Sequence, residues 1–315
     1  MKLIAHRGGA AHWPENSLHA FQQAIAVGCA GAELDIRLSA DQYPMVHHDA
    51  RLNPAFCRDG NGHWVRPHAR PRIADLSVTE LNQFRIGMMQ RGTAYARQFS
   101  QRADQPNQKV PLLSEVLSLT LAESDFLWVI ELKSEVTRAA EPGWQLLLDT
   151  TLASVAKFPD CSTVFCGFDW NLLRASMQQS PQQRCWFTTH PLPWLGVMPT
   201  NPLTPEGSER RIKLLQSFVL AGNTPWFAGF EPIHAGANLY QSFASAIAAT
   251  GGSAWFAHHS DITPELVQAC HQAGLLACAW SALVSDPAEY RRLEQCGVDM
   301  FCTDDIKATH WQDHS

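Results

Sequence analysis

The strongest constraint on the fold is an alternation, along most of the chain, of short apolar runs and amphipathic stretches. The apolar runs have the length of buried strands, and the stretches between them have helical spacing. Strands are expected at residues 3–5, 32–38, 126–133, 163–168, 185–188, 276–280 and 298–302, with weaker signals at 226–230 and 254–257 and a short extension at 44–48. This alternation predicts parallel strands joined by crossover helices.

About eight such strands in a chain of 315 residues predict an α/β protein with a TIM (β/α)8 barrel. The length alone would permit two domains, but barrels of this size fold as one, so a single domain is expected over residues 1–315. A doubly wound sheet is the alternative. A doubly wound sheet that binds a phosphate group usually has a Gly-rich loop after its first strand. No G-x-G-x-x-G sequence follows the first expected strand here, so the barrel is preferred.

Local sequence signals mark several helix ends. Asn16 is expected to cap the first helix and Gly28 to end it. Ser77-Val78-Thr79-Glu80 has the pattern of a capping box. Thr263-Pro264 has the pattern of an N-cap followed by proline in the first helical position.

A long segment interrupts the alternation after the second strand. It runs from about residue 51 to 110 and is rich in Arg, Asn, Gly and Pro. Connections in α/β units usually span about 2–6 residues, so this segment is interpreted as a small insertion into the barrel. Insertions of this size often serve as lids over a site.

Composition excludes some functions and favours others. The net charge is -6 and no long basic run occurs, so a nucleic-acid partner is not expected. The 9 cysteines are scattered without a C-x-x-C pair, which favours a reduced, intracellular protein. The first residues lack the apolar core of a signal peptide, and no apolar stretch is long enough for a transmembrane helix. A cytoplasmic location is therefore expected.

Two strands carry acidic residues in a pattern that indicates a metal site. Glu33 and Asp35 lie two residues apart on one strand and share a face, and Glu131 and Lys133 repeat this spacing on the next. In a barrel such a face looks into the lumen, where three carboxylates are costly without a partner. Oxygen-only ligands favour one hard divalent metal, Mg²⁺ or Ca²⁺.

Basic residues are expected beside these carboxylates. His6 and Arg7 follow the first strand, at the end where the active sites of barrels lie. His48 shares a face with Val46, whereas His47 takes the other. Histidines that move protons, cations and metal-binding carboxylates together predict a phosphate-ester site.

Each of these motifs also has an ordinary structural interpretation. A Glu-x-Asp pair on a strand usually forms a solvated face, and a lone histidine usually lies at the surface or is satisfied in the core. Glu15 and Asn16 suit the start of a helix. The functional interpretation therefore depends on the whole set, in order and at strand ends, rather than on any single motif.

As a set, the motifs resemble the glycerophosphodiester phosphodiesterase family. The match spans nearly the whole chain and includes His6-Arg7-Gly8, Pro14-Glu15-Asn16, Glu33-Leu34-Asp35, Val46 with His48-Asp49, Glu131-Leu132-Lys133, Phe168-Asp169 and Thr303-Asp304. The resemblance implies a TIM barrel with a small insertion between strand two and its helix. It also implies metal-dependent hydrolysis of glycerophosphodiesters to an alcohol and glycerol 3-phosphate, which belongs to lipid and glycerol metabolism.

The resemblance also implies roles for individual residues. The implied metal ligands are Glu33, Asp35 and Glu131; the general acid and base are His6 and His48, the phosphate contacts are Arg7 and Lys133, and the supporting residues are Glu15, Asn16 and Trp280. This chain departs from the family pattern at Gly167, at Leu52-Asn53-Pro54 and at Trp280-Ser281-Ala282-Leu283. These departures leave the reaction in place but leave the substrate open.

The expected partner is a small glycerophosphodiester, and two alternatives remain. One is a lysophospholipase D-like phosphodiesterase that acts on lipids, and the other is a barrel that binds without catalysis. The apolar loop 190–199, with Trp194, Leu195 and Met198, would form a wall for an acyl group or pack on neighbouring helices or a second copy of the chain.

Overall fold

The computed structural model describes residues 1–120, 125–134, 143–281 and 284–307. Eight parallel strands form a closed barrel, since β1 pairs with both β2 and β9. The barrel strands are β1 (Lys2–Ala5), β2 (Gly31–Leu38), β4 (Leu127–Leu132), β5 (Ser162–Gly167), β6 (Arg184–Thr188), β7 (Ala254–His258), β8 (Leu276–Trp280) and β9 (Met300–Thr303). The predicted TIM barrel is confirmed.

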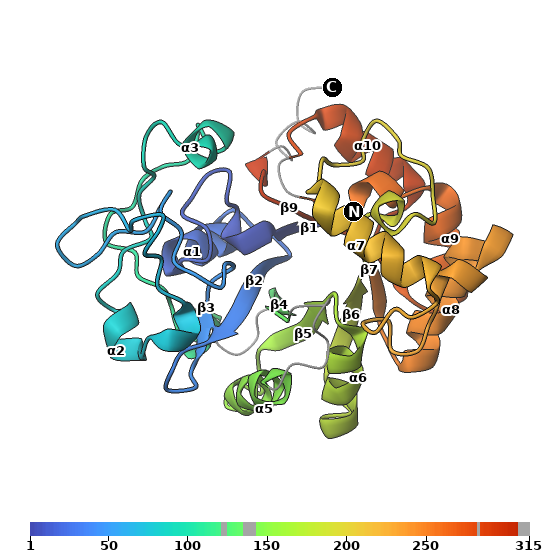
Figure 1. Cartoon of the computed structure of the whole chain (residues 1–315), viewed down its shortest axis with the longest axis horizontal. Helices are drawn as coiled ribbons and strands as arrows, with labels where there is room; N and C mark the ends of the chain where they lie inside the picture. The colour runs from blue at the N-terminus through green and yellow to red at the C-terminus, as the bar shows by residue number, and fades with distance from the viewer. Residues whose placement is uncertain (121–124, 135–142, 282–283, 308–315) are drawn as a thin grey trace.

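Helices surround the barrel on its outside (Figure 1). The α-helices outside the insertion are α1 (Leu18–Ala26), α4 (Leu113–Leu117), α5 (Trp144–Val155), α6 (Trp170–Gln179), α7 (Glu209–Leu220), α8 (Leu239–Thr250), α9 (Pro264–Gln272) and α10 (Pro287–Cys296). Short 3-10 turns are η1 (His6–Gly8), η4 (Leu192–Leu195), η5 (Pro232–His234), η6 (Gly236–Asn238) and η7 (His259–Asp261). No helix in the described part of the chain is long and apolar enough to cross a bilayer.

Strand alternation divides the interior into two apolar clusters. The larger lies between strands and helices and includes the fully buried Trp128 and Trp170. The smaller, with Val129 and Phe256, fills the lumen. Because Leu34 belongs to the outer cluster, its neighbours Glu33 and Asp35 face inward, as the strand period requires.

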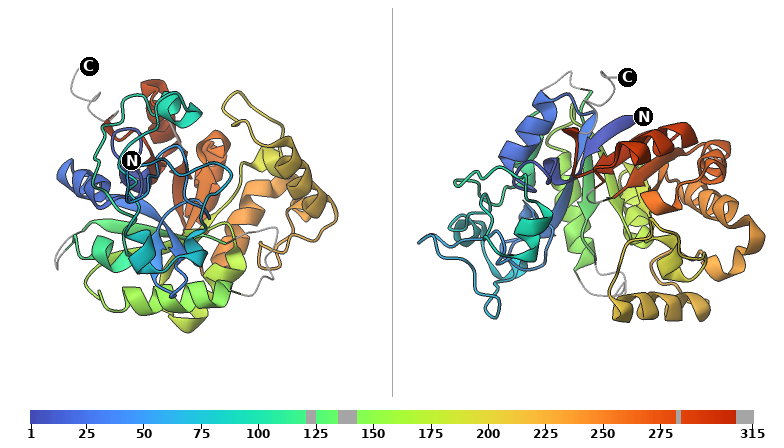
Figure 2. Two further views of the ribbon diagram at one scale, coloured as in Figure 1. Left: turned by 60° about the vertical axis from the view of Figure 1, so that its left-hand side comes forward. Right: turned by 90° about the horizontal axis from the view of Figure 1, so that it is seen from above.

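Residues 51–110 pack as a separate layer against one side of the barrel (Figure 2). Ahead of them, β3 (Pro44–Val46) pairs antiparallel with the end of β2. The segment contains η2 (Ile73–Asp75), α2 (Val78–Leu81) and α3 (Ala94–Gln98). Its own apolar cluster includes Leu52, Phe56 and Ile86. The predicted capping box is confirmed: the Ser77 and Glu80 side chains each bind the other's backbone N–H.

Two local predictions are wrong for identifiable reasons. The apolar run 226–230 forms turns instead of a strand, and Trp226 and Phe227 pack into the core from this loop. The apolar residues thus indicated that this run is buried, but not whether its backbone forms a strand or a loop. The first helix is capped by Ser17, whose side chain accepts from the Ala20 N–H at 3.1 Å. Asn16 instead has a φ of 53° and turns its side chain to Asp35. Helix α8 was not among the predicted elements.

Candidate active site

A cavity of about 340 Å³ opens at the carboxyl ends of the barrel strands. Most of the predicted site residues line it, namely His6, Arg7, Glu33, His48, Glu131, Lys133 and Trp280. Asp35 lies behind them and is fully buried, as are Glu15 and Asn16 apart from a few per cent. The structure therefore brings the predicted set together from β1, β2, the end of β3, β4 and β8.

The backbone after β1 is held in an unusual conformation that aims Arg7 at the site. Arg7 has a φ of 50°, and the next residue, Gly8, has a φ of 83°. A Cβ at Gly8 would approach the Cβ of Ala20 to 2.7 Å, so glycine permits α1 to pack directly against this turn. The backbone N–H of Arg7 then donates to Glu33 Oε2 at 3.1 Å, which places Arg7 beside the carboxylates.

Three carboxylates converge at the ends of β2 and β4. Glu33, Asp35 and Glu131 each offer an oxygen, and these oxygens lie within 4.8 Å of one another. Glu33 Oε1 is buried and has no hydrogen-bond partner in the part of the chain that the structure describes. Burial, and secondarily the charge of Asp35, raises the pKa of Glu33 to about 8. An ionised Glu33 thus requires an additional positive charge close by.

This donor set fits a hard divalent cation. All three groups are carboxylates, as Mg²⁺ and Ca²⁺ prefer, and the unpartnered Glu33 oxygen is free to bind one. Lys133 already neutralises part of the charge, with its Nζ 2.9 Å from Glu131 Oε1 and 3.3 Å from Asp35 Oδ1. Burial disfavours the ionised form of Asp35, but Lys133, His48 and Arg7 together hold its pKa well below the usual range.

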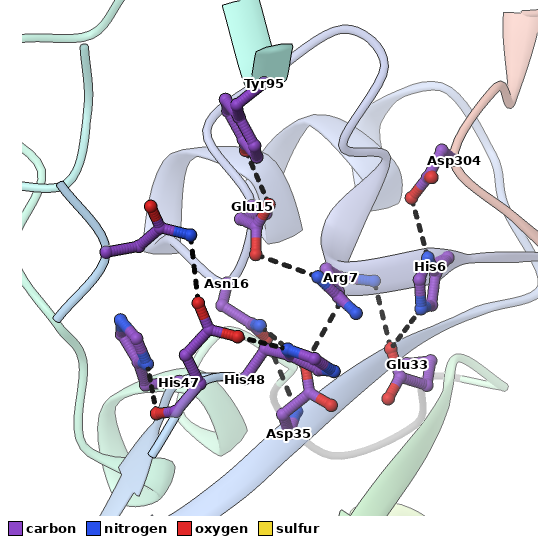
Figure 3. A network of polar contacts seen from close by, with 12 residues as sticks. His6, Arg7, Glu15, Asn16, Glu33, Asp35, His47, His48, Tyr95 and Asp304 are labelled. Atoms are coloured by element: carbon purple, nitrogen blue, oxygen red, sulfur yellow. Dashed lines mark hydrogen bonds and ion pairs between the residues drawn. The ribbon is translucent and has the colours of Figure 1, made fainter. Parts of the chain in front are cut away.

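His6 and His48 each pair with a carboxylate (Figure 3). His6 Nδ1 lies 2.7 Å from Asp304 Oδ1, and His48 Nδ1 lies 2.8 Å from Asp49 Oδ1. Burial opposes protonation of His6, but Asp304 outweighs it, so the pKa of His6 is raised. Burial and the charge of Arg7 lower the pKa of His48. The surroundings thus push the two pKa values apart, as is typical of an acid–base pair.

His47 lies away from the cavity. It is 2% exposed, and its ring approaches Phe56 with centroids 6.2 Å apart. Its Nδ1 lies 3.0 Å from the backbone oxygen of Asp49. The neighbouring histidines therefore take different faces, with His48 at the cavity and His47 in the packing of the insertion.

The insertion reaches the site through a relay of side chains (Figure 3). Arg7 Nη1 donates to Glu15 Oε1 at 3.0 Å, and its Nε lies 3.3 Å from Asp35 Oδ2. The Tyr95 hydroxyl donates to the other Glu15 oxygen at 2.5 Å. Arg102 in turn donates to that hydroxyl at 2.8 Å. Asn16 completes the support by donating to Asp35 Oδ2 at 2.7 Å. Among the described residues, none from 51–110 lines the cavity itself.

The opposite side of the cavity is aromatic. Phe168, His190, Trp194 and Trp280 line it together with Arg211 of α7. In the loop 190–199, Trp194 faces the cavity, whereas Leu195 is buried in the core and Met198 packs against it. The apolar wall predicted for this loop is thus reduced to one side chain.

The sequence interpretation missed several residues at this site. Asp304 was noted only within a motif, and no role was assigned to Tyr95, Arg102, His190 or Arg211. Asp304 is 298 residues away from His6 in the chain, and the Tyr95 contact spans 80 residues. Periodicity within a strand or helix carries no information on such pairs.

The chain is similar to known proteins in sequence and in fold. The sequence model of the Glycerophosphoryl diester phosphodiesterase family matches residues 6–308. A glycerophosphodiester phosphodiesterase of Caldanaerobacter subterraneus is 23% identical over 305 residues, 96% of this chain and 93% of its own length. Glycerophosphodiester phosphodiesterase 1 of Bos taurus is 34% identical over 118 residues, 38% of this chain. This last alignment spans 30% of the bovine protein, and that with a Bacillus subtilis relative spans 47% of its length.

The fold also matches solved structures. A protein of Silicibacter pomeroyi DSS-3, assigned to the glycerophosphoryl diester phosphodiesterases, superimposes with a TM-score of 0.75. The two chains are 28% identical, and the match covers 98% of this chain and 91% of the other.

Proposed function

Because the chain belongs to the glycerophosphoryl diester phosphodiesterase family, we propose that it hydrolyses glycerophosphodiesters to an alcohol and glycerol 3-phosphate. One observation carries the proposal: three carboxylates converge at a cavity that is also lined by the carboxylate-paired His6 and His48 and by the cations Arg7 and Lys133. Phosphodiester hydrolysis needs charge neutralisation at phosphorus, a base for the nucleophile and an acid for the leaving group. The cavity offers a candidate for each of these needs.

Glu33, Asp35 and Glu131 would hold one divalent metal, Mg²⁺ or Ca²⁺. When bound, such a metal supplies Lewis-acid polarisation of a phosphoryl oxygen. Lys133 and Arg7 face the same region and would bind the phosphate oxygens. Their ion pairs with Glu131 and with Glu15 keep both side chains in place before the substrate arrives.

His6 and His48 would share the proton transfers. The raised pKa of His6 suits a general acid that protonates the leaving alkoxide, and the lowered pKa of His48 suits a base. Asp304 and Asp49 bind the Nδ1 atoms, which leaves Nε2 of each ring on the side of the reacting groups; His6 Nε2 lies 3.8 Å from Glu33 Oε2. The base would take its proton from water or from the neighbouring glycerol hydroxyl, in which case a cyclic phosphate forms first.

The experiment is an assay on glycerophosphoglycerol and on an aryl phosphodiester, before and after treatment with EDTA. We expect hydrolysis of both, release of glycerol 3-phosphate from the first, loss of activity with EDTA and recovery with Mg²⁺ or Ca²⁺. An inactive protein that still binds a glycerophosphodiester would indicate the non-catalytic barrel. Activity unaffected by complete metal removal would contradict the metal site.

A lysophospholipid is the second candidate substrate, because Trp194 presents an apolar surface to the cavity. Each methylene buried there would contribute about 0.8 kcal/mol. The test compares kcat/KM for a lysophospholipid and for glycerophosphoglycerol in the wild type and in Trp194→Ala. A large loss confined to the lipid would support this function, and equal changes for both would leave the small diesters.

The setting of the activity is part of the proposal. The scattered cysteines favour a reducing compartment, so we place the protein in the cytoplasm, without a nucleic-acid partner. There it would recover glycerol phosphate from small products of lipid breakdown. An association between copies of the chain, for which the loop 190–199 offers apolar side chains, would be measured by light scattering.

A further inference from the structure

The side of the cavity opposite the carboxylates carries groups that the proposed reaction does not use. We call Phe168, His190, Trp194, Arg211 and Trp280 the outer wall. They come from the ends of β5 and β8, from the segment after β6, and from helix α7. Because the phosphate must lie near Lys133 and Arg7, the outer wall faces the part of the substrate that extends beyond the phosphate.

The outer wall is a fixed surface. The rings of Phe168 and His190 stack with centroids 4.4 Å apart, and the Trp280 ring meets Phe168 edge-on at 5.7 Å. Trp194 Nε1 donates to the Pro205 oxygen at 3.1 Å. A quaternary ammonium group is bound by a cage of aromatic rings whose faces are open to it. In the outer wall the rings stack on one another and expose edges as well as faces, so this surface does not form such a cage.

The charge of the outer wall is positive. Arg211 is exposed, and within the described residues it has neither an ion pair nor a hydrogen bond. Burial, and secondarily the charge of Arg211, lowers the pKa of His190 to about 3. The charge of Arg211 therefore acts on His190 as well as on the cavity. The described acidic residues that line the cavity are Glu33 and Glu131, both in the candidate ligand set. A cationic alcohol would therefore meet repulsion without a compensating carboxylate.

Two nitrogens of the outer wall also lack partners. His190 Nε2 and Trp280 Nε1 are enclosed, and neither makes a hydrogen bond to a described residue. Enclosed polar atoms without partners are unfavourable, and hydroxyl groups of a ligand can supply the missing bonds. The cavity of about 340 Å³ is at the small end of the range for small-molecule sites. A compact polar head group fits these features better than an acyl chain.

Resting on the proposed diesterase activity, we propose that the outer wall selects substrates by their leaving alcohol. It accepts a polyol, binds it more strongly when the polyol carries its own phosphate or carboxylate, and disfavours choline. Arg211 would bind the additional anionic group, and the nitrogens of His190 and Trp280 would bind hydroxyls. These residues would then decide which diester enters the same reaction.

The experiment measures kcat/KM on three diesters that share glycerol 3-phosphate: glycerophosphoinositol 4-phosphate, glycerophosphoinositol and glycerophosphocholine. The wild type should prefer them in that order. Arg211→Gln should lower kcat/KM for the phosphorylated substrate about tenfold and leave glycerophosphocholine within about twofold. Arg211→Glu should favour glycerophosphocholine. Lys213→Gln is the matched control, because Lys213 lies on the same helix and pairs with Glu209 at 2.7 Å outside the cavity.

A second variant tests the hydroxyl contacts. His190→Phe keeps a ring that can stack on Phe168 and removes the unpartnered nitrogen, so it should lower kcat/KM for glycerophosphoinositol more than for glycerophosphocholine. Equal losses for all three substrates in the Arg211 variants, or a wild-type preference for choline, would overturn the selection by the outer wall. Absence of activity on every diester would instead refute the proposed function itself.

Discussion

The two sides of the cavity differ in how their polar groups are paired. On the side of β1, β2 and β4, Arg7 pairs with Glu15, Lys133 with Glu131, and each histidine with an aspartate. On the outer wall, neither Arg211 nor the two ring nitrogens have a partner among the described residues. One side thus has its cations and histidines oriented in advance, whereas the other leaves Arg211 and two ring nitrogens for a ligand.

This difference separates two tasks. Groups that stabilise a transition state act best when they are already fixed, since no reorganisation is then required during the reaction. Groups that choose between substrates gain from contacts that only the favoured substrate completes. Substitutions on the paired side should therefore affect all substrates, and those on the outer wall should affect some more than others.

The largest effect is expected at the carboxylates. Glu33→Gln and Asp35→Asn keep the shape of each side chain but remove a negative charge, so metal affinity should fall and kcat should drop by about 10³-fold or more for every diester. Metal binding is measured by calorimetry and folding by circular dichroism. Glu209→Gln, an exposed carboxylate paired with Lys213, is the control and should keep full activity. Wild-type activity in both site variants after stripping and reloading would remove these residues from the ligand set.

The next effect concerns the histidines. His6→Ala and His48→Ala should each lower kcat by about 10²–10⁴-fold on natural diesters. With p-nitrophenol as the leaving group, which needs no acid, His6→Ala should recover most of its activity and His48→Ala should not. His47→Ala is the neighbouring control and should lose much less, because this ring packs outside the cavity. The opposite leaving-group pattern would exchange the two roles.

The sequence was informative wherever the repeat of a strand or helix decides which way a side chain faces. Glu33 and Asp35 share a strand face because side chains alternate, and this alone placed both in the lumen. The capping box at Ser77 was likewise a local signal. The run 226–230 was misassigned because its apolar residues are buried from a loop, where burial and strand formation are separate properties.

Contacts between distant segments could not be predicted in this way. Which residue caps α1 depends on Asp35, because Asn16 is drawn to that carboxylate and leaves the cap to Ser17. Tyr95 lies in an insertion whose sequence has no periodic pattern, yet its hydroxyl donates a hydrogen bond to Glu15. Arg211 has the sequence context of any charged residue on an exposed helix, and only the closed barrel brings it to the cavity.

A moderate effect is expected where the insertion supports the paired side. Tyr95→Phe removes the hydroxyl that binds Glu15 and receives Arg102, and leaves the ring packed on Phe56. Loss of one charged hydrogen bond should lower kcat about threefold to tenfold, with little change in substrate preference. Steady-state kinetics on two diesters measures both. Tyr43→Phe, at an exposed position near β3, is the control. A change in preference without a change in kcat would assign Tyr95 to substrate selection instead.

The smallest effect on activity is expected at Asp261, which contacts the turn that carries Trp194. This buried carboxylate accepts from the Leu192 N–H at 3.0 Å and so ties η7 to the turn that carries Trp194. Burial raises the pKa of Asp261 to about 7. In the unfolded chain its pKa is near 3.9, so between about pH 4 and pH 7 the folded state holds a proton that the unfolded state has lost.

The free energy of unfolding should therefore fall as the pH rises through this window, by at most about 4 kcal/mol from this group, and level off above pH 7. Asp261→Asn keeps an oxygen for Leu192 and cannot ionise, so its stability relative to the wild type should rise from pH 4 to pH 7. Urea unfolding at several pH values measures this difference. Activity should stay within about twofold, because the hydrogen bond that positions the turn survives. If the free energies of unfolding of the two proteins differ by the same amount at every pH, Asp261 is ionised throughout this range. The turn that carries Trp194 would then be bound by a charged carboxylate.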